Sequence, residues 1–122
     1  MKKYLIKNLI NNDNSSVASW IFKGKKIEIT NKGRILALEK QDGNILIIHI
    51  DKAYDEDSAF IYSPSGKIIK KIINFEKKSG CICYDDVYYV DKELTLIAGS
   101  RAKRIACVID EKGNYIRSYE TR

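Results

Sequence analysis

The sequence predicts a single, almost entirely β domain that repeats an antiparallel strand unit. Gly33 and Gly80 lie 47 residues apart, and the same spacing separates Gly66 from Gly113. Turn residues that recur at a fixed period indicate a repeated structural unit. Between the turns, short β-branched and aromatic runs alternate with clusters of Gly, Asp, Asn and Pro, which is typical of strands joined by tight turns. With 44% hydrophobic residues, residues 1–122 fit one domain with its own core.

The first full unit, residues 33–79, is predicted to be a four-stranded meander. An Asp-Gly pair at 42–43 separates its first two strands, and Asp-Gly between β-rich runs is a strong hairpin signal. A Pro-Ser-Gly turn at 64–66 separates its last two strands. The predicted strands are 34–41, 44–52, 59–63 and 67–75.

The second full unit, residues 80–122, repeats this plan, and residues 1–32 form an incomplete unit of three strands. In the incomplete unit Gly24 occupies the hairpin position of Gly66 and Gly113, so the innermost strand is the one that is missing. The predicted strands are 4–10, 17–23 and 26–30 in the incomplete unit, and 81–90, 94–99, 104–110 and 114–121 in the second full unit.

The distribution of apolar residues indicates that these units stack on one another. Residues 45–50 place apolar side chains on both sides of one strand, whereas the fourth strand of that unit carries Lys67, Lys70 and Lys71. A strand that is apolar on both sides needs a layer against each face. Together with the glycine period and the strand order, this gradient from an apolar inner strand to a charged outer strand resembles the blades of a β-propeller.

The resemblance implies an open, partial propeller. A closed propeller needs about four blades or more, and this chain supplies two and part of a third. We therefore expect the bare blade faces to be covered, either by further copies of the chain in a homo-oligomer or by a different protein. The alternatives are an up-and-down β-barrel of the ligand-carrier type and a β-sandwich.

No catalytic constellation is evident in the sequence. There is no Gly-rich phosphate loop, and the single histidine, His49, lies in an apolar run with no partner fixed by spacing. A hydrogen-bonded core or half-buried histidine is the simpler interpretation. Asp85 and Asp86 are adjacent in a predicted strand and should face opposite ways, so we interpret them as a bulge or turn rather than a carboxylate pair. We predict that the protein is not an enzyme and has no cofactor.

The cysteines indicate reduced thiols rather than a disulfide or a metal site. Cys81, Cys83 and Cys107 are odd in number, and Cys-x-Cys is not the usual spacing of zinc ligands. The basic and apolar start of the chain resembles a signal peptide, but Lys7 and Asn8 interrupt it too early. No apolar run approaches the length of a membrane span. We therefore expect a cytoplasmic protein with no metal site and no membrane partner.

An acidic segment, residues 51–58, stands out in a chain whose net charge is +6. The basic residues are spread over separate groups, which disfavours nucleic acid as the partner. The loop equivalent to the acidic segment in the second unit is basic, so two loops of opposite charge should lie on the same rim. The predicted partner-binding residues are Tyr54, Asp55, Glu56, Asp57, Arg101, Lys103 and Arg104.

These features favour a protein-binding module, because function is often carried by loops on a rigid scaffold. The small, Lys-, Ile- and Asn-rich chain is similar in kind to bacterial immunity proteins, which bind and silence a cognate toxin, often a nuclease. That resemblance implies that the acidic segment enters the basic cleft of the toxin with Tyr54 as its anchor. The alternatives are a β module that binds nucleic acid and, if the strands close into a barrel, a carrier of a small ligand.

Overall fold

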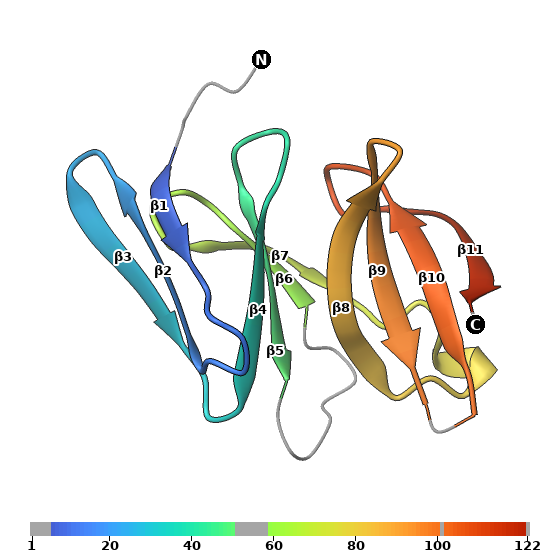
Figure 1. Cartoon of the computed structure of the whole chain (residues 1–122). Coiled ribbons are helices and arrows are strands. Elements are labelled where there is room, and N and C mark those ends of the chain that lie inside the picture. Colours follow the sequence, from blue (N-terminus) through green and yellow to red (C-terminus); the bar gives the residue numbers. More distant parts are fainter. Residues whose placement is uncertain (1–5, 51–58, 101, 122) are drawn as a thin grey trace.

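The computed structural model describes residues 6–50, 59–100 and 102–121. Over these ranges eleven strands form three antiparallel sheets (Figure 1). The N-terminal sheet contains, in order across the sheet, β1 (Lys7–Ile10), β2 (Val17–Phe22) and β3 (Lys25–Thr30). The middle sheet contains β4 (Arg34–Glu39), β5 (Ile45–Ile50), β6 (Ala59–Tyr62) and β7 (Ile68–Ile72). The C-terminal sheet contains β8 (Cys83–Val90), β9 (Glu93–Gly99), β10 (Arg104–Ile109) and β11 (Tyr115–Thr121).

This arrangement confirms the all-β prediction. Each sheet is a meander of consecutive strands, and the three sheets lie side by side in Figure 1 instead of joining into one barrel. The closer likeness to propeller blades stays a prediction. The helical structure in the described ranges is one 3-10 segment, Lys77–Ser79, and no helix there is long and apolar enough to cross a membrane.

The central strand β5 is buried on both faces, as its sequence predicts. Ile45 and Ile47 belong to a cluster that includes Trp20 of the N-terminal sheet. Leu46 and Ile48 belong to a second cluster with the buried side chains of β9 and β10. All four β5 side chains are 0% exposed, and each such burial stabilises the fold by about 2 kcal/mol. The alternation of side chains along β5 therefore requires a sheet on either side of it.

Two equivalent hairpins hold the sheets together. The hairpin between the last two strands of each four-stranded sheet packs against the preceding sheet. In the β6–β7 hairpin, Gly66 has a φ of +91° and lies so close to β3 that an added Cβ would be 2.7 Å from the Cγ2 of Ile27. The Trp20 indole N–H donates to the Pro64 carbonyl of the same hairpin over 2.6 Å. In the β10–β11 hairpin, Gly113 has a φ of +88° and packs against the middle sheet, 3.2 Å from Ile61 by the same measure. Gly66 and Gly113 therefore occupy equivalent positions in the repeat, where each hairpin contacts the preceding sheet.

A buried lysine makes a further link between the middle and C-terminal sheets. Lys40 is 0% exposed, and its ammonium donates to the Asp42 carboxylate over 2.9 Å and to the backbone carbonyl of Glu111. The Tyr89 hydroxyl donates to the Glu111 carboxylate over 2.8 Å and accepts from the Gln41 N–H over 2.9 Å. The buried cation is therefore compensated from both sheets, and losing one partner would leave a charge without solvation.

Strands β4, β7 and β8 are each shorter than predicted because their ends enter wider turns. β4 stops before its hairpin, where the Lys40 N–H donates to the Asn44 carbonyl over 2.8 Å in a turn longer than a two-residue Asp-Gly loop. β7 stops before the crossover to β8, where the Asn74 side chain donates to the Cys81 carbonyl over 2.9 Å. Side-chain and turn hydrogen bonds of this kind compete with strand pairing.

The glycine pair Gly66 and Gly24 offers a matched test of hairpin docking. Both have positive φ, but nothing lies within 4 Å of a Cβ added at Gly24. Gly24→Ala should lower the free energy of unfolding by about 1 kcal/mol, the cost of a left-handed alanine. Gly66→Ala should lower it by that amount and by about 1 to 3 kcal/mol more, because Ile27 must move. Urea unfolding would measure both, and equal losses would show that the hairpin contact contributes nothing.

Candidate partner-binding site

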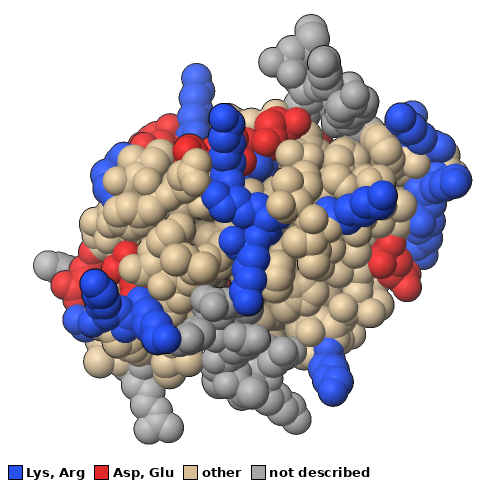
Figure 2. Space-filling model, turned by 180° about the vertical axis from the view of Figure 1, so that it is seen from behind, with Lys and Arg blue, Asp and Glu red and all other residues tan. Residues whose placement is uncertain are grey.

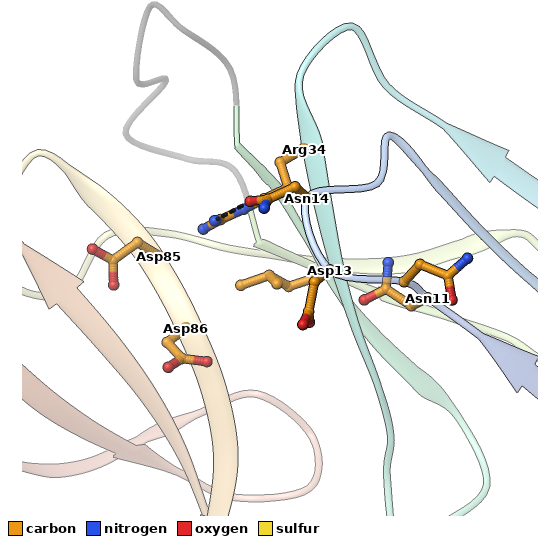
Figure 3. A pocket seen from close by; sticks show the side chains of 8 residues that line it. Asn11, Asp13, Asn14, Arg34, Asp85 and Asp86 are labelled. Atoms are coloured by element: carbon orange, nitrogen blue, oxygen red, sulfur yellow. Dashed lines mark hydrogen bonds between the residues drawn. The ribbon is translucent and has the colours of Figure 1, made fainter.

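A polar pocket of about 300 Å3 lies where the three sheets meet (Figure 3). The loop between β1 and β2 forms one wall, the beginning of β4 the next, and the beginning of β8 faces them both. In their sheets β4 and β8 are edge strands, so their backbones border the pocket directly. The lining residues are Asn11, Asn12, Asp13, Asn14, Arg34, Leu36, Asp85 and Asp86.

The loop wall is fixed by hydrogen bonds to the free edge of β4. The Asn11 amide donates to the Ile35 carbonyl over 2.9 Å and accepts from the Ala37 N–H over 3.0 Å. The Ile35 N–H donates to the Ser15 carbonyl over 2.8 Å. These bonds satisfy backbone groups at the edge of β4, with which no strand of the N-terminal sheet pairs. They also protect that edge from pairing with other chains.

Arg34 crosses the pocket from β4 with an incomplete set of partners. One of its terminal nitrogens, Nη1, donates to the Asn14 side-chain oxygen over 3.3 Å. Its Nε is buried and has no hydrogen-bond partner among the described residues. A buried donor that stays unpaired is unfavourable by about 1 to 3 kcal/mol, so this position favours an acceptor beyond those that the described residues supply.

A β-bulge in β8 brings two acidic residues to the same pocket. Tyr84 pairs with Ala98 and Asp86 with Ile97, which leaves Asp85 as the extra residue. Our interpretation of the Asp-Asp pair as a bulge is thus confirmed, but the expectation that the two side chains face apart is wrong, since both line the pocket. The bulge interrupts the alternation on which that expectation depended.

The two acids differ in how they are neutralised. Asp85 accepts two hydrogen bonds from the Arg104 guanidinium, at 2.8 Å and 2.9 Å, and lies over Gly99, where a Cβ would be 3.1 Å from its Oδ2. Asp86 accepts from the Val87 N–H over 2.8 Å. Within the described residues, neither Asp86 nor Asp13 forms a salt bridge. Figure 3 shows Asp86 on β8 and Asp13 on the opposite wall, so the pocket has two carboxylates available to a cation.

The residues predicted for the site are only partly placed. Lys103 is exposed and closes a tight turn, in which its carbonyl accepts from the Ser100 N–H over 2.9 Å. Arg104 is engaged by Asp85, so it anchors the rim of the pocket. The other predicted residues lie outside the described residues: Tyr54, Asp55, Glu56, Asp57 and Arg101.

Most of the residues that form the pocket could not be identified from the sequence. Asp13 and Asn14 lie in the polar run 11–16, which the pattern marks as a loop without showing that it binds the edge of β4. Arg34 has no local signal, because its role depends on the β1–β2 loop lying beside β4. The Asp-Asp pair in an otherwise alternating strand was the one visible signal.

His49 is a structural residue in this fold. Its Nε2 lies 3.1 Å from the Tyr62 hydroxyl, and its ring packs edge-on against Phe60 with centroids 5.3 Å apart. This agrees with the interpretation of a hydrogen-bonded, half-buried histidine. In the described parts of the chain, no group of three His, Cys, Asp or Glu side chains could hold a metal ion.

The three cysteines are buried, unpaired thiols. Burial raises the pKa of Cys107 to about 12. Burial is also the main cause of the raised pKa values of Cys81 and Cys83, with the Asp85 carboxylate adding to both. Because the thiolate is the reactive form, none of these cysteines is suited to nucleophilic chemistry at neutral pH.

Comparison with known proteins identifies a similar fold. No protein-family model matches the chain, and a comparison with curated proteins finds no significant match. A chain in the solved structure of Tne2 in complex with Tni2 superimposes with a TM-score of 0.65 and 15% sequence identity, over 89% of this chain and 79% of that chain. At this identity the likeness shows a shared fold.

The thiols give a direct test of the buried, reduced core. At pH 8, iodoacetamide should label the native protein slowly, because burial and raised pKa values keep the thiolate fraction low. In guanidinium chloride without reductant, mass spectrometry should show three labels per chain, one for each of Cys81, Cys83 and Cys107. A single label in guanidinium chloride would reveal a disulfide, and rapid labelling of the native protein would contradict the burial.

Proposed function

We propose that this chain is a protein-binding module, and more specifically an immunity protein that binds and neutralises a cognate bacterial toxin of the nuclease type. The observation that supports this most is the polar pocket, where Asp13 and Asp86 form no salt bridge with a described residue. Carboxylates on a rigid scaffold that form no salt bridge with a described residue suit a partner of opposite charge. The chain of similar fold comes from a structure of two proteins in complex, which also supports a protein partner.

A small-ligand carrier fits these observations less well. That alternative depends on a closed barrel, and the described strands form three separate sheets instead. Pockets for small ligands are mostly apolar, whereas Leu36 is the one apolar side chain among the described residues that line this pocket. Polar walls that open to the surface favour contact with another macromolecule.

Nucleic acid is disfavoured by the arrangement of charge. Figure 2 shows Lys and Arg side chains in separate groups across one face, with uncharged surface between them. The pocket presents carboxylates, which repel phosphates. A nuclease has the opposite character, because its substrate-binding cleft must be basic, and it is therefore a suitable partner for an acidic site.

Co-production with a toxin tests this proposal. The genes on either side of the coding sequence would be expressed in a host bacterium with and without this chain. We expect one neighbour to be toxic alone and harmless with this chain, and the two purified proteins to bind in isothermal titration calorimetry. If neither neighbour is toxic, or if the chain fails to protect and instead shifts DNA or RNA with steep salt dependence, the proposal fails.

The acidic segment contributes to this binding by electrostatic steering. Replacing Asp55, Glu56 and Asp57 by Asn, Gln and Asn should slow association with the toxin about tenfold at low salt, and the difference should shrink at high salt. Tyr54→Ala should speed dissociation about tenfold with little salt dependence, as expected for an aromatic anchor. Surface binding kinetics would measure both rates.

Glu28→Gln is the matched control, since it removes one exposed carboxylate on β3 of the N-terminal sheet, at a residue that does not line the pocket. It should leave both rates unchanged. If the triple variant and Tyr54→Ala also behave like wild type, the acidic segment is not part of the interface.

A further inference from the structure

We propose that the partner docks on the outer face of the C-terminal sheet and the adjoining pocket, and that it presents an apolar patch next to an arginine or lysine side chain. This inference rests on the proposed function, because it names the surface that a protein partner would use. The outer face consists of side chains on alternate positions of the four strands, namely Asp86, Tyr88, Val90, Glu93, Thr95, Ile97, Ala106, Val108, Arg117 and Tyr119.

The orientation of this face follows from the strand alternation. Leu94 and Leu96 of β9 and Cys107 of β10 lie in the core shared with the middle sheet. Successive side chains in a strand point to opposite faces, so the residues between them point away from that core. The strand register then aligns two rows across the sheet. The rows are Tyr88, Thr95, Val108 and Arg117, and Asp86, Ile97, Ala106 and Tyr119.

The outer face has the composition of a protein interface. Tyr88, Val90 and Tyr119 are 38%, 37% and 47% exposed. The side chains at the centre of the face are at most 3% exposed, namely Thr95, Ile97, Ala106 and Val108. A partner would therefore contact the flanking aromatic rings. Exposed tyrosines beside apolar residues are enriched at the energetic centres of interfaces, because they bury a large area with little loss of side-chain freedom.

The charges on this face favour a basic partner. Arg117 pairs with Glu93, and this hydrogen bond lowers the pKa of the Glu93 carboxyl, so the pair stays ionised. Arg104, on the next row, is held by Asp85. Asp86 forms no salt bridge in the described chain, and it borders both the outer face and the pocket. The face is therefore slightly acidic on a chain of net charge +6, which complements a cationic side chain of the partner.

A second copy of this chain fits the face less well. Continued stacking would place the outer face of the N-terminal sheet against it. That surface carries Lys26 and Glu28, whose side chains are 68% and 50% exposed and form an ion pair at 3.6 Å. Lys26 is already paired with Glu28 of its own chain, so it is less available to Asp86 of another copy. The occupant that the proposed function favours is a different protein with a basic and apolar surface, and a second copy is an outcome of the test.

An NMR titration with defined peptides tests the surface. The probes are the tripeptide amide acetyl-Leu-Arg-Leu and the same peptide with Glu in place of Arg, added at millimolar concentration to the isotope-labelled protein. The arginine peptide should shift the amide resonances of Asp86, Tyr88 and Ile97, and the glutamate peptide should not. Asp86→Asn and Tyr88→Ala should each weaken the binding of the arginine peptide about threefold or more. The control Ile68→Ala, at a 57% exposed position of β7, should not.

Four NMR outcomes would overturn the assignment. The first is an equal response to both peptides, the second is a response centred on β7, and the third is unchanged affinity in both face variants with native spectra. Shifts on dilution without peptide, at Tyr88 and at Lys26 together, would also overturn it, because the occupant would then be a second copy.

The toxin protection assay separates this inference from the proposed function. If the Asp86→Asn, Tyr88→Ala double variant protects as well as wild type, the function stands and the docking surface is wrong. If wild type protects against no toxin but the peptide response is as expected, the surface stands as a protein-binding site and the immunity function is wrong.

Discussion

The burial of β5 on both faces is the constraint on which the rest of this structure depends. Residues 45–48 are each fully buried, with successive side chains in opposite cores. A two-layer fold would leave one of these faces in water, at a cost of about 2 kcal/mol for each side chain. The middle sheet therefore needs a neighbour on either side. Once both neighbours are present, the β1–β2 loop, β4 and β8 meet around one pocket.

The features that the sequence predicts best are those set by local pattern. The strand order, the doubly buried strand and the hairpin positions follow from alternation and from turn glycines. The pocket could not be predicted in the same way, because it depends on contacts between segments far apart in the chain. Asn11 bonds to β4 residues 24 and 26 positions away, and Arg104 binds an acid 19 positions earlier. The bulge at Asp85 adds one residue to β8, and a period-2 pattern does not show where such an insertion falls.

The distribution of charge explains why net charge is a poor guide to this protein. The chain carries +6 overall, and that value alone suggests nucleic acid. Around the pocket, however, Arg104 is held by Asp85 and Arg34 donates to Asn14, while Asp13 and Asp86 form no described salt bridge. A partner responds to the charges that remain available at the contact, so the local sign and not the total decides what binds.

The two ends of the stack differ in a way that bears on assembly. At the N-terminal end, Lys26 and Glu28 form an exposed ion pair on the outer surface, and Ile10 of β1 is 53% exposed. At the C-terminal end, two tyrosines and a valine are exposed beside a row of short apolar side chains. The C-terminal end also carries an exposed ion pair, Arg117 with Glu93, so what distinguishes it is the two tyrosine rings beside that pair. Under the function proposed above, these rings supply the area that a different protein would bury.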